Sequence, residues 1–466
     1  MQKVKNKFSL NKISNASIAA AISILFCLIY LKFSILNSNS FQLLQKSGIP
    51  NFGDDRDGWL AFANAFPNVK EMTPLSWQVN FWPPGNIGIL SIGKFLSGSI
   101  FYASVFHVIL VSIIQAILVY QCVSLFSKER KVLPWILLIV SMLHLSFLFR
   151  SSFIDTSLTP DYLASISLAL GFVLTYKYFF ENFKNSYLPI FAALAFALSG
   201  YLRVTTFQLT LIALFVTTLG GVVLFLMKRS FPTIFRKAVT ITLITAVLFT
   251  PWVIYRSIGI YDKDYLRGLQ FSAQARFALN HQWDTPAELN ANPVLKLMGL
   301  GTACAIDKPK CTWLADRQNR ILAGTLPITI DDEWDLRSKE AIKTFLENPL
   351  TWMNIKLKFF GQSYFQKSVY DSIDSRFHFS LDLILLILFI PLVIFLILRL
   401  RRSPRKFFVI ISFFSSLFLA VQLLITQSLL RFFLPSITLL VITLLLTIHA
   451  NELEKRITIQ VPREKT

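Results

Sequence analysis

Three aspartates and an arginine lie together in a short polar segment, NFGDDRDGW, at positions 51–59. Asp54 and Asp55 are adjacent, and like charges so close raise the pKa of one carboxyl, while the neighbouring Arg56 lowers that of its partner. One carboxylate could then take a proton from a hydroxyl group as a general base, with Asp57 as a further acid. The alternative is a solvated turn, because Gly-Asp-Asp is common in turns.

The elements that must position this segment are apolar helices. Apolar residues make up 54% of the 466 positions and charged residues 15%, which is typical of a helical membrane protein. Apolar runs of roughly 17–25 residues can cross a bilayer as helices. Such runs are expected near 16–36, 100–126, 133–149, 160–180, 187–202, 205–227, 238–256, 379–399, 407–427 and 431–450. The sequence therefore predicts an all-α polytopic membrane protein with about 10–11 transmembrane helices.

The net charge of +20 indicates how the protein is oriented in the membrane and does not predict a nucleic-acid partner. Lys and Arg cluster in both tails and in the loops near 128–131, 177–184, 228–237 and 399–406. Because the chain crosses the membrane once at each predicted span, all of these segments lie on the same side. The positive-inside rule makes that side, with both termini, cytoplasmic. The 26 acidic residues lie mostly in the outer loops and none lies deep in an apolar run, which argues against an ion-coupled transporter.

Six parts follow from this topology. The segment 1–36 forms a tail and the first span, 37–99 an outer loop with the acidic motif and interfacial helices, and 100–256 a helical block. They are followed by an outer α or α/β cap over 257–378, closing helices over 379–450, and a cytoplasmic tail over 451–466. Cys304 and Cys311 share the cap; whether they form a disulfide is left open.

Arginines recur at predicted outer helix ends, where the positive-inside rule disfavours them: Arg150, Arg203, Arg256 and Arg431. A guanidinium binds phosphate through two parallel hydrogen bonds, so an anionic lipid headgroup would account for them. The alternative is snorkelling, or pairing with an outer acid such as Asp155 or Asp161.

Other outer residues are candidates for contacts with substrate. Asp155 and Asp161 lie in one outer loop and could face the acidic motif, although Asp161 follows Pro160 and could simply stabilise a helix start. Trp59 and Trp82 suit an aromatic belt at the membrane interface, and a ring stacked on a sugar is the functional alternative. No Walker or GxGxxG loop occurs, so no nucleotide cofactor is expected.

The order of these features resembles the GT-C superfamily of polyprenyl-phosphate-sugar glycosyltransferases, in particular bacterial relatives of protein O-mannosyltransferases and of the lipid A aminoarabinose transferase. The resemblance rests on an acidic pair in the first outer loop and on the further motifs Pro83–Gly85, Thr159–Asp161, SGYLR ending at Arg203, PWVIYR ending at Arg256, ENPL at 347–350 and Arg431–Pro435.

The resemblance implies an inverting transfer of one sugar from a polyprenyl-phosphate donor to a hydroxyl of a lipid, glycan or protein acceptor, at the periplasmic face of the inner membrane. Asp54 or Asp55 would be the base, and Arg56 with the outer arginines would stabilise the leaving phosphate. A divalent metal ion is compatible with it, with ligands unassigned. Trp82 stands where close relatives of the aminoarabinose transferase have lysine, which leaves the donor sugar open.

Two alternatives to single-sugar transfer are kept. One is a transferase or polymerase that moves a whole lipid-linked oligosaccharide. The other is a non-enzymatic flippase or transporter of lipid-linked glycans.

Overall fold

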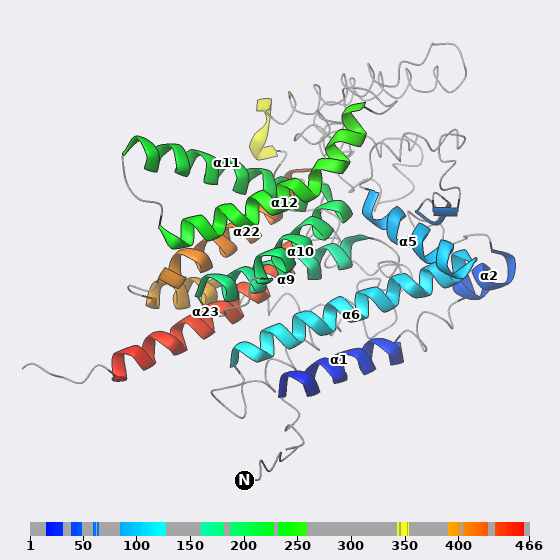
Figure 1. Cartoon of the computed structure of the whole chain (residues 1–466), viewed down its shortest axis with the longest axis horizontal. Coiled ribbons are helices and arrows are strands. Elements are labelled where there is room, and N and C mark those ends of the chain that lie inside the picture. Colours follow the sequence, from blue (N-terminus) through cyan, green and yellow to red (C-terminus); the bar gives the residue numbers. More distant parts are fainter. Residues whose placement is uncertain are drawn as a thin grey trace, which may run out of the picture.

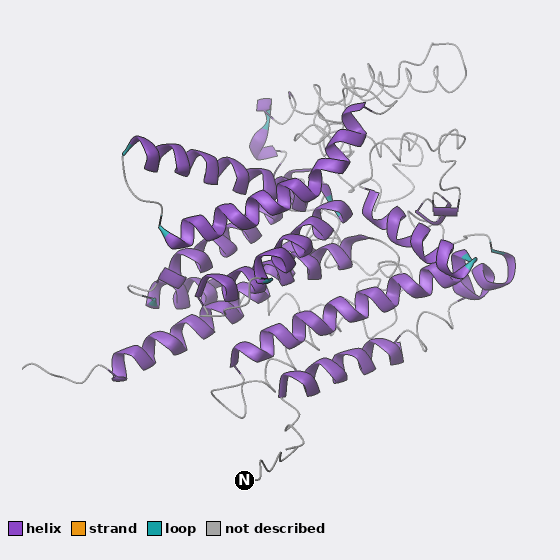
Figure 2. Ribbon diagram, viewed as in Figure 1, coloured by secondary structure: helices purple, strands orange, loops and turns teal. Residues whose placement is uncertain are grey.

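Helices make up all the regular structure in the part of the chain that the computed structural model describes, and no strand occurs there (Figure 2). The described residues are 15–30, 39–48, 59–61, 63–64, 84–126, 160–180, 187–227, 232–258, 343, 346–351, 353, 390–400, 404–426 and 434–460.

Ten helices of the described part are labelled in Figure 1, and they follow one another along the chain in the order given next. They are α1 (Asn15–Tyr30), α2 (Asn39–Ser47), α5 (Pro84–Ser97), α6 (Ile100–Phe126), α9 (Pro160–Phe180), α10 (Leu188–Leu202), α11 (Val204–Leu226), α12 (Thr233–Ile258), α22 (Pro404–Thr426) and α23 (Leu434–Gln460). A shorter apolar helix covers Ile390–Arg399. Proline opens α5, α9 and α22, where its missing N–H would have no partner in the helix anyway.

Five helices in the described ranges are long and apolar enough to cross a membrane, which fits the predicted all-α membrane protein. They comprise α6, α9, most of α11 and α12, and the first part of α23. The final helix runs to Gln460, beyond the expected end of its span at 450. The predicted span at 133–149 and nearly all of the predicted cap fall outside the described residues, so the total of about 10–11 spans stays a prediction.

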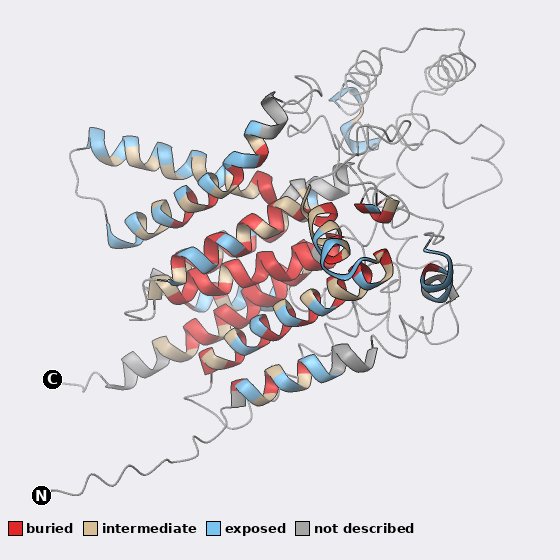
Figure 3. Cartoon of the chain, turned by 45° about the vertical axis from the view of Figure 1, so that its right-hand side comes forward, coloured by how far each residue is buried: buried red, intermediate tan, exposed pale blue. Residues whose placement is uncertain are grey.

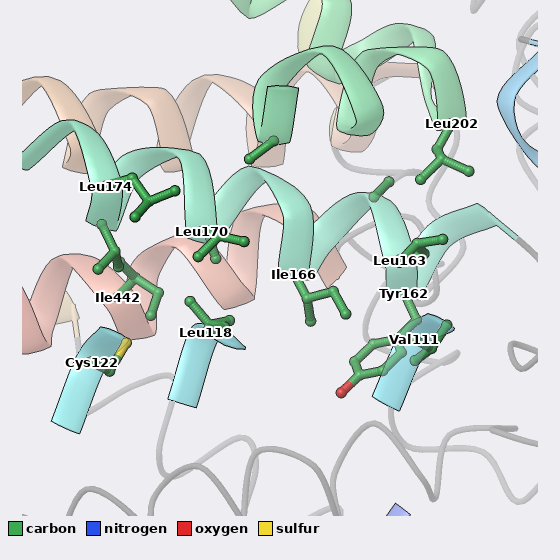
Figure 4. Packing of buried hydrophobic residues seen from close by; sticks show 14 of the residues in the cluster. Val111, Leu118, Cys122, Tyr162, Leu163, Ile166, Leu170, Leu174, Leu202 and Ile442 are labelled. Atoms are coloured by element: carbon green, nitrogen blue, oxygen red, sulfur yellow. The ribbon is translucent and has the colours of Figure 1, made fainter. Parts of the chain in front are cut away.

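Helix α9 forms the centre of the bundle. It contacts α6, α10, α12, α22 and α23, and every residue from Pro160 to Gly171 is buried. Figure 4 shows Tyr162, Ile166 and Leu170 of α9 among Val111, Leu118 and Cys122 of α6. Small residues allow this close approach: a Cβ on Gly171 would lie 2.7 Å from the ring of Phe196 in α10. Burial is concentrated here in Figure 3.

Helix α11 has a different environment. Its main contacts are with α10 and α12, and near its start Leu209 also packs against Leu168, Leu419 and Leu439. From residue 209 to residue 226 no residue is buried inside the described protein. Many of its side chains in this stretch, such as Phe215 and Val216, are apolar and exposed (Figure 3). In a membrane protein, such a surface is suited to contact with lipid acyl chains.

Candidate functional site

One end of the bundle brings together the starts of α5, α9 and α11 and the ends of α10 and α12. We call this region the junction and define it by Gly85, Asp161, Tyr201, Arg203 and Trp252. Each of these residues belongs to, or adjoins, a motif that the sequence singled out, although the motifs lie far apart along the chain. The junction is therefore the candidate site within the described part of the protein.

An ion pair between Arg203 and Asp161 lies at its centre. The Asp161 side chain is 1% exposed and the Arg203 side chain 23% exposed. Asp161 lies in the first turn of α9, where the helix dipole favours a negative charge. Burying either charge alone would be costly, so each requires the other. The structure thus brings together two residues that the sequence had singled out separately, and it confirms the pairing alternative for Arg203.

The helical backbone is interrupted between α10 and α11 at Arg203, whose backbone is extended at φ −142° and ψ 123°. Its N–H donates to the carbonyl of Ser199 at 2.9 Å, and its own carbonyl accepts from the N–H of Thr206 at 3.1 Å and from Thr206 Oγ1 at 2.6 Å. These bonds satisfy backbone groups that the ends of both helices would otherwise leave without partners. The guanidinium is consequently carried on a well-bonded corner rather than on a long loop.

Residues that follow Asp161 in α9 form hydrogen bonds with two neighbouring helices, and these bonds fix the position of Asp161. Ser199 Oγ of α10 donates to the carbonyl of Ala164 at 2.7 Å, and the Tyr162 hydroxyl donates to Gln115 Oε1 of α6 at 3.1 Å. Sequence reasoning missed Ser199 and Gln115. The available signal was a polar side chain inside an apolar span, which marks a candidate functional position.

An aromatic wall covers the α11 and α12 side of the junction. Phe207 lies 4.4 Å from Phe249 and 5.2 Å from Trp252 between ring centroids, and Tyr201 lies 5.6 Å from Trp252. The Tyr201 hydroxyl donates to the carbonyl of Leu248 at 2.7 Å. The SGYLR and PWVIYR segments are thus packed against each other by their aromatic rings.

The Pro-Pro-Gly segment contacts the same place. A Cβ on Gly85 would lie 2.6 Å from the carbonyl oxygen of Tyr201, so the start of α5 approaches the end of α10 at a distance that only glycine permits. This contact explains why glycine follows the prolines.

The segment that follows the acidic motif docks on α5. Trp59 is 2% exposed and belongs to the same buried cluster as Leu44 of α2 and Leu90 of α5. Lys94 Nζ of α5 donates to the carbonyl of Asn64 at 2.5 Å. Trp59 is therefore a packing residue in this structure, and its contact with a sugar stays a prediction.

Several predicted site residues lie outside the described residues: Asp54, Asp55, Arg56, Asp57, Trp82, Arg150, Asp155 and Arg431, together with Cys304 and Cys311. Arg256 lies within α12, but its side chain is outside the described part. In the ranges that are described, no group of three or more His, Cys, Asp or Glu could hold a metal ion. The metal ion of the resemblance stays a prediction.

No protein-family model, curated protein or solved structure matches this chain. The function must accordingly be argued from the junction and from the motifs.

Proposed function

We propose that this protein is an integral-membrane inverting glycosyltransferase of the GT-C type, which moves a sugar from a polyprenyl-phosphate donor to an acceptor hydroxyl. The observation that carries the proposal is the meeting of dispersed motifs at the junction. Gly85, Asp161, Arg203 and Trp252 come from four of the segments on which the resemblance rests, and they lie at one end of the bundle.

The proposed step is a single displacement at the anomeric carbon of the sugar. The acceptor oxygen forms a bond to that carbon while the bond to the phosphate oxygen breaks. The acceptor proton passes to Asp54 or Asp55, and polyprenyl phosphate leaves with the bonding electrons. Negative charge develops on the leaving phosphate, where oriented cations lower the barrier most effectively.

Arg203 is the described cation that best suits this role. The ion pair with Asp161 orients its guanidinium at the end of the bundle, and its donors are arranged to bind oxygens along more than one edge. The pair is neutral as a whole, so a phosphate would share the guanidinium with Asp161. In this proposal Asp161 is a positioning residue, and the acidic motif supplies the base.

The test compares surface glycans and lipid-linked sugars by mass spectrometry in cells lacking the gene, complemented with the wild-type chain or with variants. Asp54→Asn and Asp55→Asn are each expected to leave the acceptor without its sugar, because the base is lost, at unchanged protein level. Glu454→Gln, which removes an acid near the C-terminal end of α23 and outside the junction and the motifs, is the matched control and should behave as wild type. Normal transfer by both aspartate variants would refute the proposal.

Permeabilised membranes separate the alternatives. A flippase is bypassed when donor and acceptor have access to both faces, whereas a transferase is still required. Loss of transfer in permeabilised membranes without the chain supports the enzyme, and restored transfer supports the flippase. The mass added to the acceptor distinguishes one sugar from a whole oligosaccharide.

A further inference from the structure

Two cations from neighbouring helices meet the last carbonyls of α9, at the end opposite the junction. Lys237 Nζ of α12 donates to the carbonyls of Tyr178 at 2.6 Å and Phe179 at 3.3 Å. Arg405 Nη2 of α22 donates to the carbonyl of Phe180 at 3.5 Å. The final carbonyls of a helix lack partners within it and carry partial negative charge. Because the three acceptors are consecutive residues, the starts of α12 and α22 both lie against the same end of α9.

The first turns of α12 and α22 have an unfavourable charge distribution of their own. Neither contains an acidic residue, and each contains two cations, Arg236 and Lys237 in α12 and Arg405 and Lys406 in α22. A helix start favours negative charge, so cations there are destabilising unless an anion is nearby. The α9 carbonyls compensate Lys237 and Arg405. Arg236 is exposed and Lys406 half-buried, and their side chains form no hydrogen bond or ion pair with other described residues.

The flanking sequence adds to the same charge. Segments 228–237 and 399–406 hold four and five basic residues and no acidic one. In sequence they are far apart, and the contacts of Lys237 and Arg405 with one helix end bring their termini to the same place. An anionic partner at this end of α9 would be attracted to the described cations of both helices, Arg236 and Lys237 of α12 and Arg405 and Lys406 of α22.

Exposed apolar stripes begin next to these cations. On α12, Arg236 is followed on the same face by Leu243 and Val247, which are 52% and 67% exposed. On α22, Lys406 adjoins Phe407, Ile411 and Phe414, which recur at helical spacing and are also exposed. Cations next to exposed apolar stripes are suited to bind a molecule that has an anionic headgroup and acyl chains. A free phosphate would contact only the cations.

We propose that the first turns of α12 and α22, around Arg236 and Lys406, bind the phosphate headgroup of an anionic phospholipid whose acyl chains lie along these stripes. Basic residues between transmembrane helices at one membrane face commonly bind such headgroups. The proposal is independent of the glycosyltransferase function, because none of its residues belongs to the junction.

The test uses the full chain purified into nanodiscs and released for native mass spectrometry, with phosphatidylglycerol or phosphatidylcholine as the lipid. The double variant Arg236→Gln/Lys406→Gln keeps Lys237 and Arg405, so the end of α9 remains capped. It should retain roughly tenfold less phosphatidylglycerol than wild type, with phosphatidylcholine unchanged. The charge-matched control Lys46→Gln/Lys343→Gln removes two cations elsewhere and should retain lipid as wild type does.

Three results would overturn the proposal. Equal retention of both lipids by the wild-type chain would show that binding does not depend on the charge of the headgroup. An equal loss in the control variant would show that net charge alone attracts the lipid. Displacement of the lipid by inorganic phosphate at matched concentration would show a site for a free anion.

Discussion

Arg203, the extended residue between α10 and α11, forms an ion pair with Asp161 in the first turn of α9. The pair links three helices at the end of the bundle where the motifs meet. Since Asp161 is 1% exposed, the pair is structural as well as a candidate for function, and the two roles must be separated by experiment.

Removing either partner should destabilise the protein strongly. Arg203→Ala leaves a buried carboxylate without its cation, an effect of about 3–5 kcal/mol for buried pairs. Asp161→Ala should also destabilise, and the double variant should cost clearly less than the two single effects together. Thermal unfolding in detergent measures the cycle. Additive effects would show that the pair does not couple energetically.

The exposed pair between Lys343 and Glu347 serves as the reference for this cycle. Its side chains are 62% and 55% exposed, one helical turn apart. Exposed ion pairs contribute about 0–1 kcal/mol, so the same substitutions there should shift the melting temperature little.

Gly85→Ala should disturb the junction. The added methyl group would lie 2.6 Å from the carbonyl oxygen of Tyr201, a backbone atom that cannot rotate away, so α5 must shift from α10. We expect lower stability and a loss of sugar transfer. Gly88→Ala lies one turn along the same helix with nothing within 4 Å of its new methyl group, and it should be neutral or slightly stabilising. Similar behaviour of the two variants would contradict the contact.

Gly200→Ala tests the aromatic wall. Its methyl group would overlap the ring of Phe249, and forcing extra volume into a packed site typically costs about 1–3 kcal/mol. Gly221→Ala is the control, because its methyl group would be 3.7 Å from Phe235, an ordinary contact. Unfolding temperature measures both, and an unchanged value for Gly200→Ala would mean that the wall is loosely packed.

Lys94→Met tests how the segment after the acidic motif is held. The change keeps the aliphatic stem and removes the donor to the carbonyl of Asn64, a bond worth about 1 kcal/mol. If that bond helps to place the acidic motif, the variant should lower the turnover of sugar transfer more than its small effect on stability suggests. Lys94→Arg restores a donor and should recover most activity. A turnover equal to wild type in Lys94→Met would show that packing around Trp59 holds the segment without it.

Much of the fold was predictable because transmembrane helices satisfy their own backbone hydrogen bonds and follow apolar run length. The spans at 100–126 and 160–180 have the bounds that the apolar runs indicated. The site was less predictable. Asp161 and Arg203 were identified separately, and their pairing was one of several alternatives. Ser199 and Gln115 stood out only as polar side chains inside apolar spans, a signal that does not say which residue each one contacts.

The sequence by itself determined the helical membrane class, the helix start at Pro160 and the candidate residues, because these depend on local composition and spacing. The predicted topology already placed these motifs at outer helix ends and the basic segments on the opposite side. Only the tertiary structure decided that Arg203 pairs with Asp161, that Gly85 touches Tyr201, and that Lys237 and Arg405 reach the same end of α9. The physical reason is that helix-to-helix packing depends on the shape of side chains far apart in sequence. The length of an apolar run predicts that a helix spans the bilayer, but it does not determine which neighbouring helices that helix contacts.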